Sequence, residues 1–402
     1  MTTTTHRTPA IVWGRGATAL GILRCLHLAN IPAFVAGPPR DAVAASRFYR
    51  PIPGANPWHG TLDAGARDAL RALPFDAAVV IPSADDTALW LSDIPASDLA
   101  RRVRVSTSPR AALEILQDKT KFAAFLRNTD IPHPRTFMIE SVEDIAAIPY
   151  EELDSTFLKP ANSQTFSDIT GAKALRVSSR DELARIWAQL DGQGFTLMAQ
   201  EYVPGPPSNH YFVDGFRDAR GRIAGLFARR RLRMHPADFG NSSYCRSIPL
   251  DEIPAAVDSI VELVTTLGYR GIFSAEFKRD ARDGTFRIIE VNTRAWTYVE
   301  FAARCGVNVC AMAYDDALDR AVAPAPKAYA VGEGCVDFHR DVNAVMNGAA
   351  GNSLPTILWQ WARAHFHTFR LDDPGPGIFA ARQILSERRE RRARKESAAV
   401  MQ

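Results

Sequence analysis

The chain has 402 residues, of which 46% are hydrophobic and 23% charged, and its formal net charge is +3. This length is enough for about two or three domains with sizeable cores, and the small net charge does not favour a nucleic-acid binder. No apolar run approaches the roughly 18–20 residues of a membrane span, and no basic-then-apolar signal pattern opens the chain. We therefore expect a cytoplasmic protein that contacts neither nucleic acid nor a membrane.

The first hundred residues alternate short apolar strands with amphipathic helices, a pattern typical of a doubly wound α/β domain. We expect strands at 10–13, 31–36, 77–82 and 103–107, with a helix at 17–29. Gly14, Gly16 and Gly21 loosely match a dinucleotide-binding loop, but no acidic residue follows the second strand to hold a ribose. A tight strand-to-helix turn is therefore favoured over nicotinamide binding, although the helix amino terminus suits an anion.

Two lysines in the next part of the chain are candidates for binding an anion. A helix is expected from Pro109 to about Asn128 and contains Lys119, and a strand at 155–160 ends in Lys159. A lysine ammonium is a compact charge that suits a polyphosphate. A lysine on a helix is more often a solvent-facing residue, so the residues alone leave the role of Lys119 open.

Arginines cluster after a predicted strand at 195–203 and two more at 210–215 and 223–229. The planar guanidinium fork matches carboxylate and phosphate oxygens, so we expect Arg231 or Arg233 to face an anionic substrate. The alternative is a solvated basic face. An irregular segment is expected before Ser242, then an amphipathic helix at 253–267.

Residues 271–294 read as two strands joined by a short polar turn. If the hairpin is symmetric about Asp283, Glu276 lies opposite Glu290, and alternation places Ile288 and Asn292 on the same face as Glu290. Opposed carboxylates repel each other, so we expect this pairing only where another group offsets the repulsion. Mg²⁺ binds protein carboxylates and phosphate oxygens, so Glu276, Glu290 and the amide oxygen of Asn292 are a predicted metal site. The alternative is a solvated hairpin face with incidental charges.

Several motifs, taken in order, resemble the ATP-grasp superfamily. They are Asp118-Lys119, Lys159-Pro160, Gln200-Glu201, Glu276-Phe-Lys278 and Glu290-Val-Asn-Thr-Arg294. The turn at 46–50 (SRFYR) and the segment at 372–376 (DDPGP) resemble segments of carboxylate–amine ligases. These ligases belong to the D-aspartate-ligase-like, carbamoyl-phosphate-synthase-like group.

The resemblance implies roles for individual residues. Lys119 and Lys159 would bind ATP phosphates, and Arg294 would hold oxyanion charge. Backbone or side-chain contacts to adenine and ribose would come from Gln200, Glu201 and Val203. For Glu201 the alternative is a salt-bridged residue at a strand end. The metal would be Mg²⁺, with Mn²⁺ as a substitute.

The fold class expected is α/β and α+β. A doubly wound amino-terminal α/β domain (1–108) precedes a two-lobed ATP-grasp core (109–320, with lobes 109–200 and 201–320). A small, mostly helical extension with a basic tail (321–402) follows. Five cysteines without a CxxC spacing indicate buried, reduced thiols.

The activity implied is an ADP-forming ligase that joins a small carboxylate to an amine through an acyl phosphate. The alternatives are a carboxylase or small-molecule kinase built on the same ATP site, and a nucleotide-binding regulatory protein without turnover. The partners would be the carboxylate and amine substrates. The oligomeric state stays open, with a homodimer as one alternative.

Overall fold

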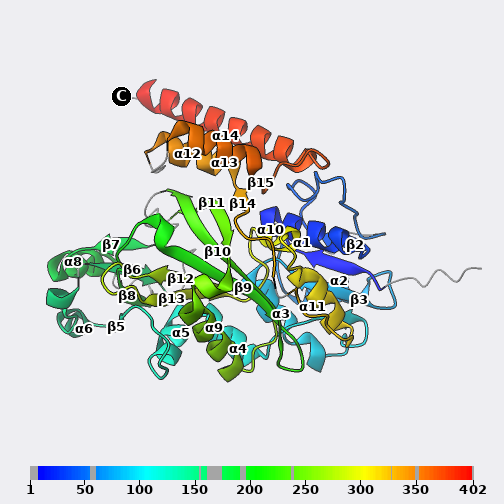
Figure 1. Ribbon diagram of the computed structural model, residues 1–402, viewed down its shortest axis with the longest axis horizontal. Coiled ribbons are helices and arrows are strands. Elements are labelled where there is room, and N and C mark those ends of the chain that lie inside the picture. Colours follow the sequence, from blue (N-terminus) through cyan, green and yellow to red (C-terminus); the bar gives the residue numbers. More distant parts are fainter. Residues whose placement is uncertain are drawn as a thin grey trace, which may run out of the picture.

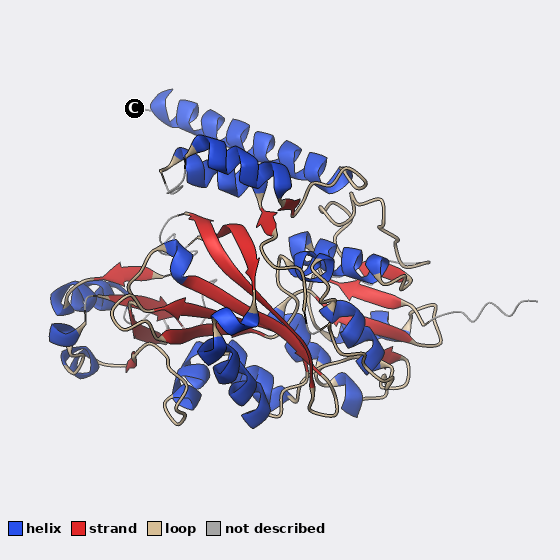
Figure 2. Ribbon diagram, in the orientation of Figure 1, coloured by secondary structure: helices blue, strands red, loops and turns tan. Residues whose placement is uncertain are grey.

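The computed structural model describes residues 8–54, 60–153, 155–160, 174–190, 196–236, 240–326, 328–348 and 353–400. Three sheets organise them, with strand orders β2-β1-β3-β4, β5-β8-β6-β7 and β13-β12-β9-β10-β11-β14-β15. The long third sheet runs through the middle of the molecule, between the other two (Figures 1 and 2). The mixed α/β architecture agrees with the expected fold class.

The first sheet is parallel and carries helices on both faces, as predicted for a doubly wound domain. Successive residues of β1 point to opposite cores: Val12 packs with α1, and Ile11 packs with α2 and α3. The elements are β1 (Ala10–Trp13), α1 (Gly16–Leu28), β2 (Ala33–Ala36), α2 (Ala64–Arg71), β3 (Ala78–Pro82), α3 (Asp85–Leu91) and β4 (Val103–Arg104).

The single helix expected from Pro109 to Asn128 is two helices, α4 (Arg110–Gln117) and α5 (Lys119–Leu126). Asp118 between them has extended backbone, and its side chain accepts hydrogen bonds from the backbone N–H groups of Thr120 and Lys121. An aspartate in this role ends one helix and caps the next. The break places Lys119 at the first position of α5.

The first lobe contains an antiparallel four-stranded sheet. Its buried face packs on two helices through Leu158 and Ala199 of the sheet and Ile145 and Leu183 of the helices. The elements are β5 (Thr136–Ile139), α6 (Val142–Ala146), β6 (Thr156–Pro160), β7 (Leu175–Val177), α8 (Arg180–Leu190) and β8 (Leu197–Glu201).

The second lobe is built on the seven-stranded sheet. The irregular segment expected before Ser242 is wrong in part, because β10 continues to His235 and pairs with a further strand, β11. Helices α9, α10 and α11 pack on this lobe. The elements are β9 (His210–Arg217), β10 (Ile223–His235), β11 (Asn241–Ile248), α9 (Pro254–Thr266), β12 (Gly271–Arg279), β13 (Phe286–Asn292), α10 (Val299–Arg304) and α11 (Val309–Ala317).

The carboxyl-terminal extension is mostly helical and lies across one end of the molecule (Figure 1). Its two short strands continue the sheet of the second lobe. The elements are β14 (Gly334–Val336), α12 (Phe338–Met346), α13 (Leu354–Arg363), β15 (His365–Phe366) and α14 (Gly375–Val400).

A buried ion cluster joins this extension to the first domain. Arg24 of α1 is fully buried and donates to Asp373, at 2.9 Å, and to Glu300, at 3.2 Å. The hydroxyl of Ser46 also donates to Asp373, at 2.7 Å. The motifs at 46–50 and 372–376 therefore contact each other in this buried ion cluster, which consists of Arg24, Ser46, Glu300 and Asp373.

The five cysteines are free and buried, as expected. Among the described residues, no helix is long and apolar enough to cross a membrane.

Candidate active site

The hairpin β12–β13 brings the two predicted metal ligands together. In its antiparallel register Glu276 pairs with Glu290, and Ser274 pairs with Asn292. The cross-strand pairing of the two carboxylates that was predicted from strand alternation is therefore confirmed.

A β-bulge at Ile289 corrects one of the predicted faces. The register passes from the Glu276–Glu290 pair directly to Phe277–Ile288, so Ile289 has no partner in the ladder. A bulge inserts one residue and shifts the following side chains to the other face. Ile288 therefore joins the hydrophobic core, and Ile289 lines the cleft between the lobes. The expectation that Ile288 shares a face with Glu290 is wrong.

The two carboxylates have different surroundings. Glu276 Oε1 accepts from Nδ1 of His210 at 2.6 Å and lies 3.1 Å from a terminal nitrogen of Arg231. Burial works to raise the pKa of Glu276, but Arg231 and His210 outweigh it and lower this pKa to about 2. Glu276 is thus held as a carboxylate.

Glu290 has no such cationic clamp. The surrounding protein reduces the solvation of its carboxylate, and Glu276 stands opposite, so both effects raise the pKa of Glu290. Lys159 acts in the opposite direction. A cation placed between the two carboxylates would relieve their repulsion, and this is the chemistry expected of a metal-binding pair.

The predicted phosphate-binding lysines reach the same cleft. Lys159 Nζ donates to Oε1 of Gln200 at 2.7 Å, and Nε2 of Gln200 donates to the hydroxyl of Thr136 at 3.2 Å. Burial, together with the nearby charge of Lys119, lowers the pKa of Lys159 to about 8 against the attraction of Glu290. The loop that follows Lys159, at 161–173, lies outside the described residues.

Two adjoining cavities contain most of the predicted site. One, of about 160 Å³, is lined among others by Lys119, Lys159, Gln200, Glu290 and Asn292. The other, of about 520 Å³, is lined among others by Lys159, Gln200, Glu201, Val203, His210 and Lys278. Lys159 and Gln200 belong to both, so the cavities form one cleft between the lobes.

The side chain of Glu201 is already paired. Its Oε1 accepts from Arg282 at 2.8 Å, and its Oε2 accepts from the backbone N–H of Arg135 at 3.1 Å. It is also almost fully buried. The structure thus gives Glu201 the salt-bridged position at a strand end and does not leave its carboxylate open to a ribose.

Asp85 of the first domain organises the end of β13. Its Oδ2 accepts from Nε of Arg294 at 3.1 Å, and its Oδ1 accepts from the backbone and hydroxyl of Thr293, each at 3.1 Å. A terminal nitrogen of Arg294 donates to Oδ1 of Asn292 at 3.1 Å. Arg294 and Asn292 are therefore held together beside the carboxylate pair.

The two candidate arginines of β10 have different partners. Arg231 contacts Glu276 and donates through Nε to the hydroxyl of Ser242 at 2.8 Å. Arg233 is fully buried and binds both oxygens of Asp341 in α12, at 2.9 and 2.7 Å. A buried guanidinium that is already bound in this way has no exposed atom for a substrate. The expectation that Arg233 faces an anionic substrate is therefore wrong. Arg233 instead connects β10 to α12 of the extension.

The donor set fits a metal that is shared with phosphates. Among the described residues, no three His, Cys, Asp or Glu side chains form a metal-holding group. Glu276, Glu290 and Asn292 supply two carboxylates and one amide oxygen, which are few protein ligands and all oxygen. Mg²⁺ is typically bound by one or two carboxylates plus substrate phosphates and water, so this set suits Mg²⁺.

Three residues of the cleft were not predicted as site residues. His210 reaches Glu276 because β9 pairs with β12, and Asp85 reaches Arg294 from another domain. Lys278 was noted as part of the Glu276-Phe-Lys278 motif, but no role was assigned to it. No local spacing could have revealed the first two contacts, because each joins segments far apart in the sequence.

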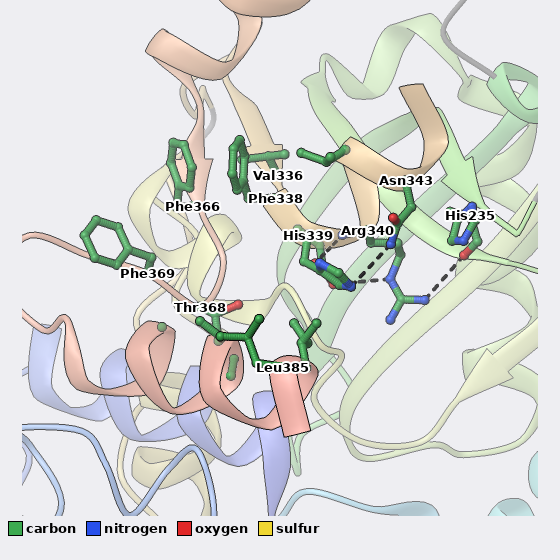
Figure 3. Close-up of a pocket in the computed structure, with 16 residues that line it drawn as sticks. His235, Val336, Phe338, His339, Arg340, Asn343, Phe366, Thr368, Phe369 and Leu385 are labelled. Carbon is green, nitrogen blue, oxygen red and sulfur yellow. Dashed lines mark hydrogen bonds and ion pairs between the residues drawn. The ribbon is translucent and has the colours of Figure 1, made fainter. Parts of the chain in front are cut away.

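A separate cavity of about 740 Å³ lies in the extension, between α12 and the start of α14. Figure 3 shows Phe366 and Phe369 on one side of it, and His235, Arg340 and Asn343 on the other. Arg340 donates to the carboxylate of Asp337 at 3.2 Å. This cavity is mainly apolar and contains none of the predicted site residues.

Comparison with known proteins supports the architecture. No family model matches the chain. A D-aspartate ligase of Enterococcus faecium (strain Aus0004) is 23% identical over 211 residues, which cover 50% of this chain and 50% of that protein. The chain thus spans about half the length of the curated relative that it matches.

Solved structures are similar over more of the chain. A biotin carboxylase from Campylobacter jejuni is 16% identical, with a TM-score of 0.60 over 81% of this chain and 74% of that one. An L-amino acid ligase from Bacillus licheniformis is 16% identical, with a TM-score of 0.55 over 78% and 75%. An N5-carboxyaminoimidazole synthetase from Staphylococcus aureus is 11% identical, with a TM-score of 0.59 over 82% and 81%. The TM-scores show a shared fold, and at identities this low the similarity shows the fold alone.

Proposed function

We propose that this chain, which has the ATP-grasp fold, is an ATP-dependent ligase that joins a small carboxylate to an amine and releases ADP and phosphate. The observation that carries the proposal is the convergence of two kinds of group on one cleft. Lys119 and Lys159 from the first lobe and Glu290 and Asn292 from the second line the same cavity. Such a combination suits a metal-bound triphosphate.

The carboxylate pair would hold Mg²⁺ against the β- and γ-phosphates. When bound there, the ion would neutralise charge that develops on the transferred phosphoryl group. Arg231 is a positioning residue in this scheme, because its contact keeps Glu276 ionised and oriented.

The chain's own residues would act in two steps. In the first, an oxygen of the substrate carboxylate attacks the γ-phosphorus, the bond to the β–γ bridging oxygen breaks, and ADP leaves. Lys119 and Lys159 would stabilise the charge on the phosphates. In the second, the amine nitrogen attacks the carbonyl carbon of the acyl phosphate, the carbon–oxygen bond breaks, and phosphate and a proton leave.

Arg294 is the residue we assign to the second step. It lies at the end of β13 beside Asn292, and Asp85 fixes its guanidinium. A cation held in this way can stabilise the oxyanion formed when the amine adds to the carbonyl carbon. Gln200 and the backbone at Val203 would contact the nucleotide base.

A carboxylase is the second candidate, because two of the solved structures described above, the biotin carboxylase and the N5-carboxyaminoimidazole synthetase, have names that refer to carboxylation. It would use the same ATP site with bicarbonate as the phosphorylated acid. A kinase and a regulatory protein without turnover are less supported, because neither explains the match to a D-aspartate ligase.

The test is a screen for ADP release with pairs of carboxylates and amines, at saturating Mg²⁺. D-aspartate belongs in the panel both as acid and as amine, because the similar enzyme from Enterococcus faecium is named a D-aspartate ligase. We expect ADP and phosphate, and hydroxylamine should trap the acyl phosphate as a hydroxamate. AMP and pyrophosphate would contradict the proposal, and ADP formed only with bicarbonate would favour the carboxylase.

A further inference from the structure

Lys278 is a nearly buried cation without an acceptor in the second cavity of the cleft. Only 8% of the residue is exposed, and it lines this cavity. Among the described residues, its Nζ has no hydrogen-bond or ion-pair partner. Its Nζ lies over the ring of Tyr202, 4.5 Å from the ring centroid. A charge removed from water in this way is costly unless an opposite charge meets it.

The other described residues that line the cavity do not supply that opposite charge. Lys159 and Arg176 line it together with Lys278, and the guanidinium of Arg176 also lies 4.5 Å from the Tyr202 ring. Among these described lining residues the one carboxylate is that of Glu201, which is bound to Arg282 and to the backbone of Arg135. The cavity thus has an excess of positive charge and suits an anionic occupant.

The position of Lys278 along β12 identifies the part of the occupant that it meets. It lies two residues from Glu276 on the same face of the strand, roughly 6–7 Å further along. On its other side is the segment that follows β8, where Tyr202 and Val203 line the cavity. A nucleotide with its β- and γ-phosphates at the carboxylate pair and its base near Val203 would pass Lys278 with its α-phosphate.

We propose that the ammonium of Lys278 binds the α-phosphate of the nucleotide, as a cation contributed by the second lobe opposite Lys159 of the first. This inference rests on the proposed function, because it assumes a nucleotide in the cleft. The ammonium lies over the ring of Tyr202, and a nucleotide phosphate would give it an acceptor.

The test compares AMP with adenosine, which differ by the α-phosphate. Binding is measured by calorimetry without metal for the full chain, for Lys278→Met and for Lys278→Arg. Arg279→Met, the loss of an exposed cation one residue away, is the matched control. We expect Lys278→Met to lower the affinity for AMP roughly ten- to hundredfold and to leave the affinity for adenosine unchanged. Lys278→Arg should retain most of the AMP affinity, and the control should not change it.

Each other result would overturn the inference. Equal losses for AMP and adenosine would place Lys278 on the base or ribose, and unchanged AMP affinity would make it a cation without a nucleotide role. If the unmodified chain binds neither ATP nor AMP, the proposed function fails with it. Lys278→Met should also raise the midpoint of thermal unfolding of the nucleotide-free chain, because it removes a buried unpaired charge. If this variant does not fold, Lys278→Gln gives the same comparison.

Discussion

Asp85 and Arg294 are joined across a domain boundary, with Oδ2 of Asp85 3.1 Å from Nε of Arg294. Asp85 begins a helix of the first domain, and Arg294 follows the last strand of the metal-site hairpin. The first domain therefore sets the orientation of the residue that we assign to oxyanion stabilisation. This relationship leads to the first prediction.

Asp85→Asn should slow amide formation by roughly ten- to hundredfold, because it weakens the contact that positions Arg294. The measurement is steady-state kinetics with the amine varied, alongside ATP titration. Asp86→Asn alters the exposed neighbouring carboxylate and should behave like the unmodified chain. Equal rates for Asp85→Asn and the control would remove Asp85 from the mechanism.

Glu290→Gln should abolish ADP release, and Glu276→Gln should impair it severely, because each removes a charged metal ligand. We expect losses on the order of 10²–10⁴-fold at saturating Mg²⁺. Glu262→Gln, on the exposed side of α9, is the matched control. Binding of Mn²⁺ in the presence of ADP, followed by its paramagnetic signal, gives a readout independent of turnover. Near-normal activity in both variants would exclude a metal role for the pair.

Lys119→Ala and Lys159→Ala should each weaken binding of a non-hydrolysable ATP analogue and leave the fold intact. Each removes a cation from the cavity that also contains Glu290. Lys121→Ala removes an exposed lysine two residues from Lys119, paired with Glu114, and should change neither affinity nor stability measurably. If the analogue binds all three variants alike, the phosphate site lies elsewhere.

The affinity for ATP should fall as the pH rises from 7 to 9. The pKa of Lys159 is lowered to about 8, chiefly by burial. The ammonium is therefore mostly charged at pH 7 and mostly neutral at pH 9, and only the charged form attracts phosphate. Binding at pH 8 should take up protons, measurable by calorimetry in buffers of different ionisation enthalpy. Lys159→Arg, which stays charged, should show less uptake, and the remainder should come from Lys278, whose pKa burial also lowers to about 8. Equal uptake in both proteins would assign the proton to another group.

Arg24→Met should destabilise the protein by about 3–5 kcal/mol, because it leaves Asp373 and Glu300 buried without their shared cation. Arg71→Met removes an exposed arginine paired with Asp68 and Asp98 and should cost at most about 1 kcal/mol. Thermal unfolding of the three proteins makes the comparison. A small shift in the unfolding midpoint for Arg24→Met would mean that the buried ion cluster does not stabilise the attachment of the extension.

Local patterns were enough to predict the elements that carry the candidate site. The opposition of Glu276 and Glu290 follows from strand alternation on either side of a short turn, which involves only neighbours in the sequence. The parallel strands of the first domain were recognisable for the same reason, as short apolar runs separated by amphipathic helices.

Two of the remaining features are local hydrogen-bonding details, and the others depend on contacts between distant segments. The bulge at Ile289 and the capping of α5 by Asp118 change local geometry through hydrogen bonds that strand and helix periodicity does not encode. The separate partners of Arg231 and Arg233 required β10 to be placed between β12 and α12. His210, Asp85 and Lys278 acquired their surroundings only when strands and domains packed together. Electrostatic environment is a property of the assembled cleft, because it depends on which charges and how much protein surround a group, and neither is contained in sequence spacing.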